Sequence, residues 1–316
     1  MKASFIDCSV STRQLLESAA PELLSDVDIH VGDPVEHDEL VRRIRGATAI
    51  VNGHTNMDRA LFASLGDELR SIIFLGTGAS SYIDLDAAHE RDIQVRVIRS
   101  YGDRTIAEHA FALMLSAARN VVAADRGVRK GDWPRPRAFE LFGKTVGIVG
   151  FGGVGTEFAS LCYGFGMSVA GWNRSPVDVD VPVEWMDADE VFARADVVSL
   201  HLALTPETKH FVNSRRLDLM RAKSVLINTA RGDLIDEAAL VRKLKGRDLS
   251  HAALDVFASE PLPSDSPFLE LDNVTLTAHN AWDTPEASGR LLRSGFEILQ
   301  EDLATLSRGE PLTSRS

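Results

Sequence analysis

The chain has 316 residues, of which 44% are hydrophobic and 25% are charged, a composition typical of a soluble globular protein long enough for two domains. Its formal net charge of −12 argues against nucleic acid as a main partner, because phosphate binding requires a basic face. No apolar run approaches the roughly 18 residues of a membrane span, and Asp7 interrupts the first apolar stretch before a signal-peptide core could form.

Only two cysteines are present, Cys8 at the end of a predicted strand and Cys162 on the apolar face of a predicted helix. Two buried thiols argue against a disulfide framework and against a cysteine metal site, and we expect no bound metal. Free thiols fit a reducing compartment, so we expect the protein to be cytoplasmic.

Residues 1–98 alternate strand-like and helix-like segments, which implies βαβ units and a parallel sheet. This region is therefore predicted to be a small α/β domain. Its strands are expected at residues 3–8, 28–31, 47–52, 71–75 and 93–97, and its helices at residues 12–20, 39–44, 58–65 and 84–91.

The fourth of these strands leads into the loop Gly76-Thr77-Gly78-Ala79-Ser80-Ser81. Ligands bind at the carboxyl ends of strands in such sheets, and the N–H groups of this loop could hold a small carboxylate. On the local sequence alone, an ordinary strand-to-helix turn is an equal alternative.

Residues 104–124 are predicted to form one long helix whose apolar stripe is rich in alanine, a pattern that suggests close packing between domains. His109 lies beside this stripe and is interpreted as a structural group rather than a catalyst. The segment from Gly127 to Phe142, which contains Trp133, is predicted to be a connector loop. Some of its basic residues could contact a partner subunit.

Residues 144–174 are predicted to form a strand, a glycine turn, a helix and a second strand. The apolar run 145–149 is typical of a buried strand. Phe158, Leu161, Cys162 and Phe165 then recur at the spacing of one helix face, and Gly166 ends the helix.

The glycine turn has the spacing of a dinucleotide-binding loop. Gly150 permits the tight turn, Gly152 lets a pyrophosphate approach the backbone, and Gly155 lets the helix pack on the strand. The phosphates would face the free N–H groups at the start of the helix, and Gly153 and Val154 complete the predicted loop. A glycine-rich turn without a ligand is the alternative.

The second strand ends in Asn173-Arg174-Ser175, where NAD-binding proteins usually carry an acidic residue for the ribose hydroxyls. Without that acid, a 2′-phosphate is not repelled, and Arg174 and Ser175 offer a guanidinium and a hydroxyl to it. We therefore favour NADP(H) over NAD(H). Alternatively, Arg174 is a solvated loop residue or stacks on the adenine of NAD.

Alternation resumes after residue 174, so a second α/β domain is predicted. Strands are expected at residues 196–201, 224–228, 251–257 and 273–277, and helices at residues 213–219, 237–245 and 284–308.

Three ionisable residues, Arg231, Glu260 and His279, lie just past the carboxyl ends of successive predicted strands. Those ends share one edge of a parallel sheet, the edge that also holds the glycine turn. Arginine can bind a substrate carboxylate and polarise a carbonyl, histidine can transfer a proton, and a carboxylate beside it favours its protonated form. Taken singly each residue is more often structural, but together they predict a catalytic site.

The sequence resembles the D-isomer-specific 2-hydroxyacid dehydrogenase family, in its glyoxylate/hydroxypyruvate reductase-like branch, nearly from end to end. The motifs that carry the resemblance are Gly76-Thr77-Gly78, Ile106-Ala107-Glu108-His109-Ala110, residues 143–155, Leu204-Thr205-Pro206-Glu207-Thr208, Asn228-Thr229-Ala230-Arg231-Gly232, Ala253-Leu254-Asp255-Val256-Phe257 with Glu260-Pro261-Leu262, and Thr277-Ala278-His279 with Ala281-Trp282.

The resemblance implies an α/β fold of two Rossmann-like doubly wound parallel-sheet domains around a cleft. The substrate domain would be flavodoxin-like and discontinuous, formed by residues 1–98 and 284–316, and residues 99–283 would bind the dinucleotide. The family usually forms homodimers through the cofactor domains.

By the same resemblance, His279 would be the acid/base, Glu260 its partner, and Arg231 the group that binds the substrate carboxylate and carbonyl. Further substrate contacts would come from Thr77, Gly78, Ala79 and Trp282. Further cofactor contacts would come from Thr105, His201, Thr205, Thr229, Ala230 and Asp255. The expected reaction is hydride transfer between NAD(P)H and a small 2-oxo acid to give a D-2-hydroxy acid.

The sequence departs from the family pattern in a loop one residue longer before Ile83 and in Val97, where many members have Asn. Ala203 and Ala278 replace prolines that are common in the family. None of these changes removes a catalytic group. Trp282 corresponds to a substrate-facing tryptophan found in some members, including the C-terminal-binding corepressors. The alternative function is therefore a nucleotide-sensing protein of that type without significant turnover.

Overall fold

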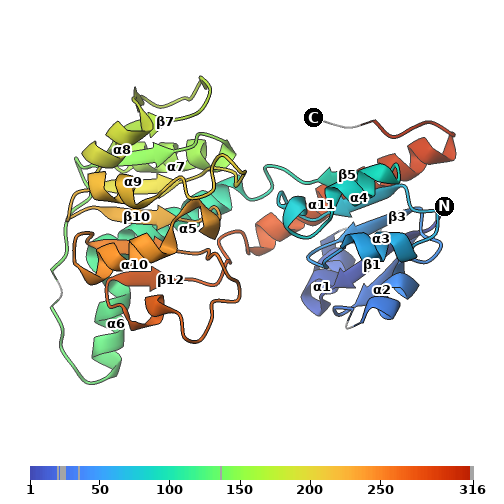
Figure 1. The fold of residues 1–316 in the computed structure, drawn as a ribbon, viewed down its shortest axis with the longest axis horizontal. Coiled ribbons are helices and arrows are strands. Elements are labelled where there is room, and N and C mark those ends of the chain that lie inside the picture. The colour runs from blue at the N-terminus through green and yellow to red at the C-terminus, as the bar shows by residue number, and fades with distance from the viewer. Residues whose placement is uncertain (20, 22–25, 35, 136, 314–316) are drawn as a thin grey trace. The chain divides into compact units, whose positions relative to one another are not determined.

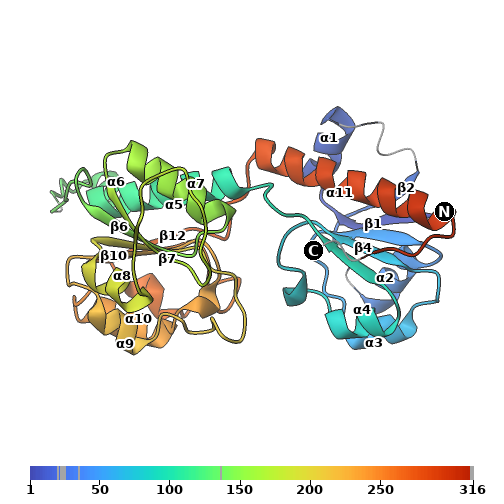
Figure 2. The same cartoon turned by 90° about the horizontal axis from the view of Figure 1, so that it is seen from above.

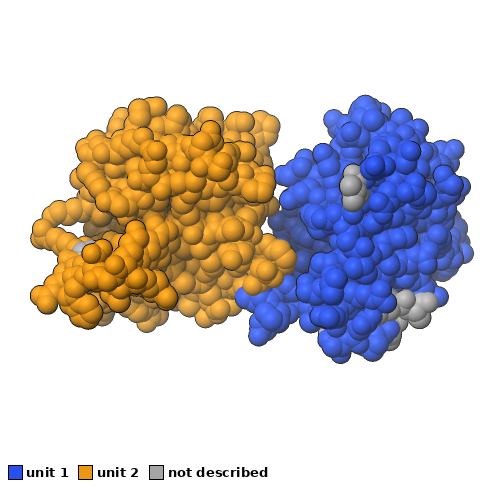
Figure 3. Space-filling model, turned by 90° about the horizontal axis from the view of Figure 1, so that it is seen from below, with its two compact units in different colours: residues 1–102, 284–316 blue, residues 103–283 orange. Residues whose placement is uncertain are grey.

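The computed structural model describes residues 1–19, 21, 26–34, 36–135 and 137–313. The chain forms two compact units, one of residues 1–102 and 284–316 and the other of residues 103–283 (Figure 3). The first segment of this unit ends at Gly102, whereas the sequence predicted a boundary after residue 98. Ile98 N–H donates to Gly76 O (2.9 Å) and Arg290 Nε donates to Tyr101 O (2.8 Å), which keeps residues 98–101 with the first unit.

The first unit is built on a five-stranded parallel sheet in the order β2-β1-β3-β4-β5, which is the flavodoxin-like order (Figure 1). Together with the second parallel sheet described below, this sheet confirms the predicted α/β fold. The strands are β1 (Ala3–Cys8), β2 (Val27–Val31), β3 (Ala49–Asn52), β4 (Ser71–Phe74) and β5 (Gln94–Val97).

Helices cover both faces of this sheet (Figure 2), α1 and α11 on one face and α2, α3 and α4 on the other. Their bounds are α1 (Val10–Ala19), α2 (His37–Ile44), α3 (Arg59–Ser64), α4 (Leu85–Glu90) and α11 (Pro285–Ser307). Ala20, the last residue of the first predicted helix, lies outside the described residues.

The terminal helix α11 returns to the first unit and is anchored there by buried polar groups. Thr284 caps its start by accepting from Ala287 N–H (3.2 Å). Further along, the Asp302 carboxylate accepts from Ser71 Oγ (2.6 Å) and from Arg96 Nε and Nη2 (3.0 and 2.9 Å). The sheet and the last helix are thus joined by a buried ion pair.

The second unit contains a seven-stranded parallel sheet in the order β12-β11-β10-β9-β6-β7-β8. Counted within this unit it is the dinucleotide-binding order, extended by one strand. The strands are β6 (Thr145–Val149), β7 (Ser168–Trp172), β8 (Glu184–Trp185), β9 (Val197–Leu200), β10 (Val225–Asn228), β11 (His251–Leu254) and β12 (Val274–Leu276).

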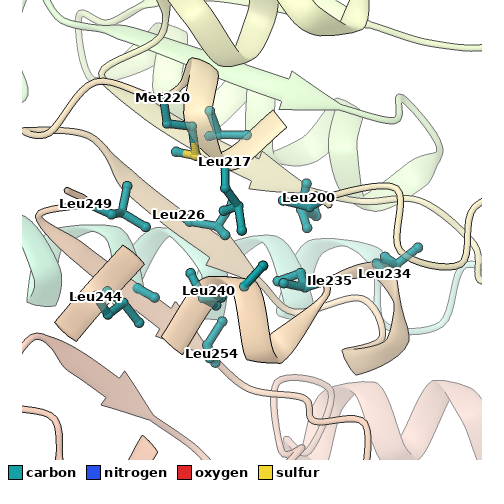
Figure 4. Close-up of a cluster of buried hydrophobic side chains, with 14 of the residues drawn as sticks. Leu200, Leu217, Met220, Leu226, Leu234, Ile235, Leu240, Leu244, Leu249 and Leu254 are labelled. Carbon is teal, nitrogen blue, oxygen red and sulfur yellow. The ribbon is translucent and has the colours of Figure 1, made fainter. Parts of the chain in front are cut away.

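Helices also cover both faces of the second sheet (Figure 2). They are α5 (Asp103–Arg119), α6 (Val121–Arg129), α7 (Gly153–Gly164), α8 (Ala188–Arg194), α9 (Ser214–Leu219) and α10 (Glu237–Lys245). A cluster of leucines from β9, β10, β11, α9 and α10 forms the core on one side, including Leu200, Leu226, Leu240 and Leu254 (Figure 4).

The prediction of one helix over residues 104–124 is wrong. Asn120 has a left-handed backbone (φ 52°), which ends α5 and starts α6 in a new direction. Helix α6 then runs into the predicted connector as far as Arg129. The apolar stripe gave no sign of this break, because the turn depends on the conformation of one polar residue.

Two smaller features also differ from expectation. Phe165, predicted on the buried face of α7, is 43% exposed, although Phe158 and Cys162 are fully buried. The two-residue edge strand β8 was not predicted, because it is exposed and lacks an alternating pattern. Cys8 and Cys162 are both buried free thiols, as expected.

No helix among the described residues is both long and apolar enough to cross a bilayer.

Candidate active site

The turn between β6 and α7 requires glycine at two positions. Gly150 has φ 99°, and a Cβ there would lie 2.7 Å from His201 O. A Cβ at Gly155 would lie 2.1 Å from Gly150 O. At Gly152, in contrast, a Cβ would meet open space, so the backbone is accessible from outside. These are the features that a dinucleotide-binding loop needs.

The first backbone bond of α7 runs from Thr156 N–H to Gly152 O (3.0 Å). Within the described part of the chain, the N–H groups of Gly153, Val154 and Gly155 have no acceptor. Such unpaired N–H groups at the positive end of a helix can receive phosphate oxygens. The predicted loop residues therefore fit a pyrophosphate.

Asn173 ties the glycine loop to the end of β7. Its Oδ1 accepts from Phe151 N–H (3.1 Å), and its Nδ2 donates to Ser175 O (2.9 Å). Asn173 therefore shapes the loop, and Arg174 and Ser175 next to it are exposed.

Arg174 has no hydrogen-bond or ion-pair partner among the described residues, but its charge acts on Glu207 in the loop after β9. There, the Thr205 hydroxyl, a backbone N–H and, with a smaller effect, the charge of Arg174 lower the pKa of Glu207. Thr205 and Arg174 thus act on the same exposed carboxylate, that of Glu207.

His201 packs against the glycine loop and is half-buried. Its Nε2 lies 2.9 Å from Ser199 Oγ and its ring lies 5.1 Å from the Phe158 ring, while Nδ1 is buried and has no hydrogen-bond partner among the described residues. Burial lowers the pKa of His201 to about 3. It is therefore neutral at physiological pH and can support the loop but cannot supply a charge to a phosphate.

The ends of β10, β11 and β12 lie side by side, with Asn228 paired to Leu254 and Leu254 to Leu276. The segments that follow these strands bring Glu260 and His279 together, with His279 Nδ1 2.6 Å from Glu260 Oε2. Two of the three predicted catalytic residues thus form a direct pair, although they are distant in the sequence.

Opposing effects act on the Glu260 carboxyl. Burial raises its pKa, but hydrogen bonds from His279 and from Phe257 N–H (2.8 Å), with the charges of His279 and Arg231, outweigh burial and lower the pKa overall. Glu260 is therefore ionised at neutral pH. It accepts a hydrogen bond from His279 Nδ1, which carries a proton. The contact leaves the other ring nitrogen, Nε2, outside this pair.

The charge of Arg231 helps to lower the pKa of Glu260. The turn that carries it is shaped by buried Asn228, whose Nδ2 donates to Arg231 O (2.8 Å) and whose Oδ1 accepts from Ala230 N–H (3.0 Å). Thr229 is buried in the same turn. Asn228 was not predicted as a site residue, although a buried amide at the end of an apolar strand is a usable signal.

His279 has a left-handed backbone (φ 52°), and Asp255 holds it there. His279 N–H donates to Asp255 O (2.8 Å). The fully buried Asp255 carboxylate accepts from Thr277 Oγ1 (2.6 Å), Asn280 N–H (3.1 Å) and Ala281 N–H (3.0 Å). Asp255, predicted to lie near the nicotinamide, thus fixes the segment that carries His279.

Two further predicted residues lie near the ends of the second unit. Thr105 is buried in the first turn of α5, and Trp282, close to the end of the unit, is half-buried.

In the first unit, the loop after β4 turns at Gly76 (φ 152°) and continues into a short 3₁₀ helix, Ala79–Ser81. Its N–H groups at Thr77, Gly78 and Ala79 have no acceptor within the described residues. The described part of the protein therefore does not use these three N–H groups itself.

Comparisons with known proteins agree with these features. The family model of the NAD-binding domain of D-isomer specific 2-hydroxyacid dehydrogenases matches residues 111–281. The chain is 34% identical over 280 residues to a glyoxylate reductase of Korarchaeum cryptofilum, with 86% of this chain and 83% of the relative covered.

It is also 35% identical over 303 residues to a D-3-phosphoglycerate dehydrogenase of Methanocaldococcus jannaschii. That match covers 93% of this chain but 56% of the relative, so the chain spans little more than half the length of that protein. Among solved structures, an acyclic imino acid reductase in complex with NADPH and D-Arg matches with a TM-score of 0.83 and 28% identity, and 99% of each chain is covered.

Proposed function

Because the chain belongs to the D-isomer specific 2-hydroxyacid dehydrogenase family, we propose that it reduces a small 2-oxo acid to a D-2-hydroxy acid with NAD(P)H. The observation that carries the proposal is the 2.6 Å contact between His279 and Glu260 on the sheet edge that also bears the glycine loop, with the charge of Arg231 acting on Glu260.

The chemistry of the three residues follows from their charges. Arg231 would bind the substrate carboxylate and polarise the neighbouring carbonyl group. The Glu260 carboxylate would hold the His279 ring through Nδ1, and the ring would deliver a proton from Nε2 to the carbonyl oxygen. A bound reduced nicotinamide would supply the hydride to the carbonyl carbon.

In the first unit, the N–H groups of Thr77, Gly78 and Ala79, which have no acceptor among the described residues, would bind a small carboxylate. We therefore assign the first unit to substrate binding and the second unit to the dinucleotide. Thr105, Thr229, Ala230 and Asp255 would lie around the nicotinamide, and Trp282 would face the substrate. The two buried free thiols suit a cytoplasmic location.

The proposal is tested by following the oxidation of NADPH and NADH with glyoxylate, hydroxypyruvate, pyruvate and phenylpyruvate. We expect turnover with at least one of these 2-oxo acids. If none is reduced although the cofactor binds tightly, the protein is instead a nucleotide-sensing binding protein.

We further propose that the cofactor is NADP(H), with its 2′-phosphate beside Arg174 and Ser175. Replacing Arg174 by alanine should weaken NADPH binding about tenfold, because a charge-assisted hydrogen bond is lost. NADH binding should change little. Fluorescence titration with both cofactors measures this, and Arg247→Ala, at an exposed arginine of the same unit, is the control. Equal losses for the two cofactors would argue against a phosphate contact.

We also propose that the chain forms a homodimer through the second unit. Helix α6 has no buried residue, and Val121, Val128, Trp133 and Phe142 in and after it are 53–76% exposed. An apolar set of this size suits a protein interface.

Replacing Trp133 by aspartate should shift the protein from dimer to monomer in sedimentation velocity, because a charge would be buried in the interface. Leu269→Asp, at an equally apolar exposed position, should leave the dimer intact. A wild-type protein that is monomeric at all accessible concentrations would contradict the proposal.

A further inference from the structure

His109 on α5 contacts two residues, Thr277 and Asp255, that hold the segment carrying His279. Its Nε2 lies 3.1 Å from Thr277 Oγ1 and 3.5 Å from Asp255 Oδ1. The side chain is 24% exposed, while Asp255 is fully buried. His109 therefore links a helix of the second unit to the polar network beneath the catalytic segment.

The direction of the hydrogen bonds in this network follows from its members. The Asp255 carboxylate can only accept, so Thr277 donates its hydroxyl proton to Oδ1 (2.6 Å). The Thr277 oxygen is then free to accept, so His109 carries its proton on Nε2 and donates. The chain of donors therefore runs from His109 through Thr277 to Asp255.

Asp255 in turn determines the backbone of the catalytic segment. Its carboxylate accepts from Asn280 N–H and Ala281 N–H, and its carbonyl accepts from His279 N–H. A buried carboxylate is stable only if donors or positive charge surround it. His109 supports this arrangement, because its Nε2 orients the Thr277 hydroxyl that donates to Oδ1.

We propose that His109 is a positioning residue, which holds His279 in its productive orientation through Thr277 and Asp255. This inference rests on the proposed function, since it assigns His279 a catalytic role. His109 itself does not touch the substrate in this proposal. Loss of the His109 side chain should change the orientation of the His279 ring and leave binding of the cofactor unaffected.

The chain offers a close control for this proposal. His251 on β11 makes the same type of contact, with Nε2 2.9 Å from Thr275 Oγ1 on β12, and both partners are buried. No described hydrogen bond connects that pair to Asp255. A His251→Leu variant therefore measures what the loss of a buried histidine–threonine pair does to stability alone.

The test compares His109→Leu, His109→Gln and His251→Leu. In His109→Leu we expect kcat to fall about 5- to 10-fold, as for the loss of one hydrogen bond, with an unchanged Kd for NADPH. His109→Gln, whose amide can donate to Thr277, should recover most of the rate. Thr277→Val should lower kcat similarly, and the double variant with His109→Leu should lose no more than either single variant.

A second readout does not require turnover. In protein labelled with ¹³C at histidine Cε1, the His279 resonance is assigned by its absence in His279→Asn. We expect this resonance to move in His109→Leu and to stay in place in His251→Leu. An unmoved resonance in His109→Leu overturns the proposal whatever happens to the rate. If the wild type reduces no 2-oxo acid, the proposed function fails, and the resonance alone decides the role of His109.

Discussion

Replacing His279 by alanine should lower kcat by ~10²–10⁴-fold, because the reduction then lacks its general acid. Because Glu260 lies 2.6 Å from Nδ1, we expect Nε2 to be the nitrogen that transfers the proton. Steady-state oxidation of NADPH with the best 2-oxo acid measures the effect, and the Kd for NADPH should stay within a factor of about two.

Alanine is strained at the left-handed backbone of residue 279, so part of its effect could come from the loop. His279→Asn avoids this, because asparagine tolerates that conformation but cannot act as the acid. Both variants should lose the same large factor. His89→Ala, at an exposed histidine of α4, should keep full activity. Turnover near the wild-type rate in His279→Asn would remove His279 from the mechanism.

Replacing Asp302 by alanine should lower the free energy of unfolding by ~3–5 kcal/mol, because Arg96 is left as an unpaired buried charge. Both side chains are less than 10% exposed, and Asp302 also accepts from Ser71. Urea unfolding followed by circular dichroism measures the loss. All four tryptophans lie in the second unit, so tryptophan fluorescence reports the unfolding of that unit. The urea midpoint measured by fluorescence should change much less.

The control for this prediction is an exposed ion pair of the same unit. Lys2 and Asp28 lie 3.0 Å apart with about half of each side chain exposed. Asp28→Ala should therefore cost at most ~1 kcal/mol. Similar losses in Asp302→Ala and Asp28→Ala would mean that the buried pair contributes no more than a solvated one.

The two parallel sheets with helical crossovers could be predicted from the sequence, because strand and helix patterns alternate. The flavodoxin-like and Rossmann-like arrangements were expected only from the family resemblance. The meeting of Glu260 with His279 was also predictable from the sequence pattern, since strand ends converge at one edge of a sheet. These inferences depend on backbone topology, which apolar patterns and glycines encode locally.

Features that depend on single side-chain conformations were not predictable. Nothing in the stripe of α5 indicated that Asn120 adopts a left-handed backbone and ends that helix. The role of His109 was likewise hidden, because its partners Thr277 and Asp255 are remote in the sequence and meet it only after folding. The bonds from Asn173 to the glycine loop also depend on a rotamer that sequence does not specify.

The central claim is that the edge bearing Arg231, Glu260 and His279 reduces a 2-oxo acid by direct hydride transfer. The most direct test is a single turnover with NADPH deuterated at the transferable C4 position and the 2-oxo acid that is reduced fastest. We expect a D-2-hydroxy acid that carries deuterium at C2, and none of it with Arg231→Ala and His279→Asn combined. An unlabelled product, an L product, or no product from any 2-oxo acid with either cofactor bound would contradict the claim.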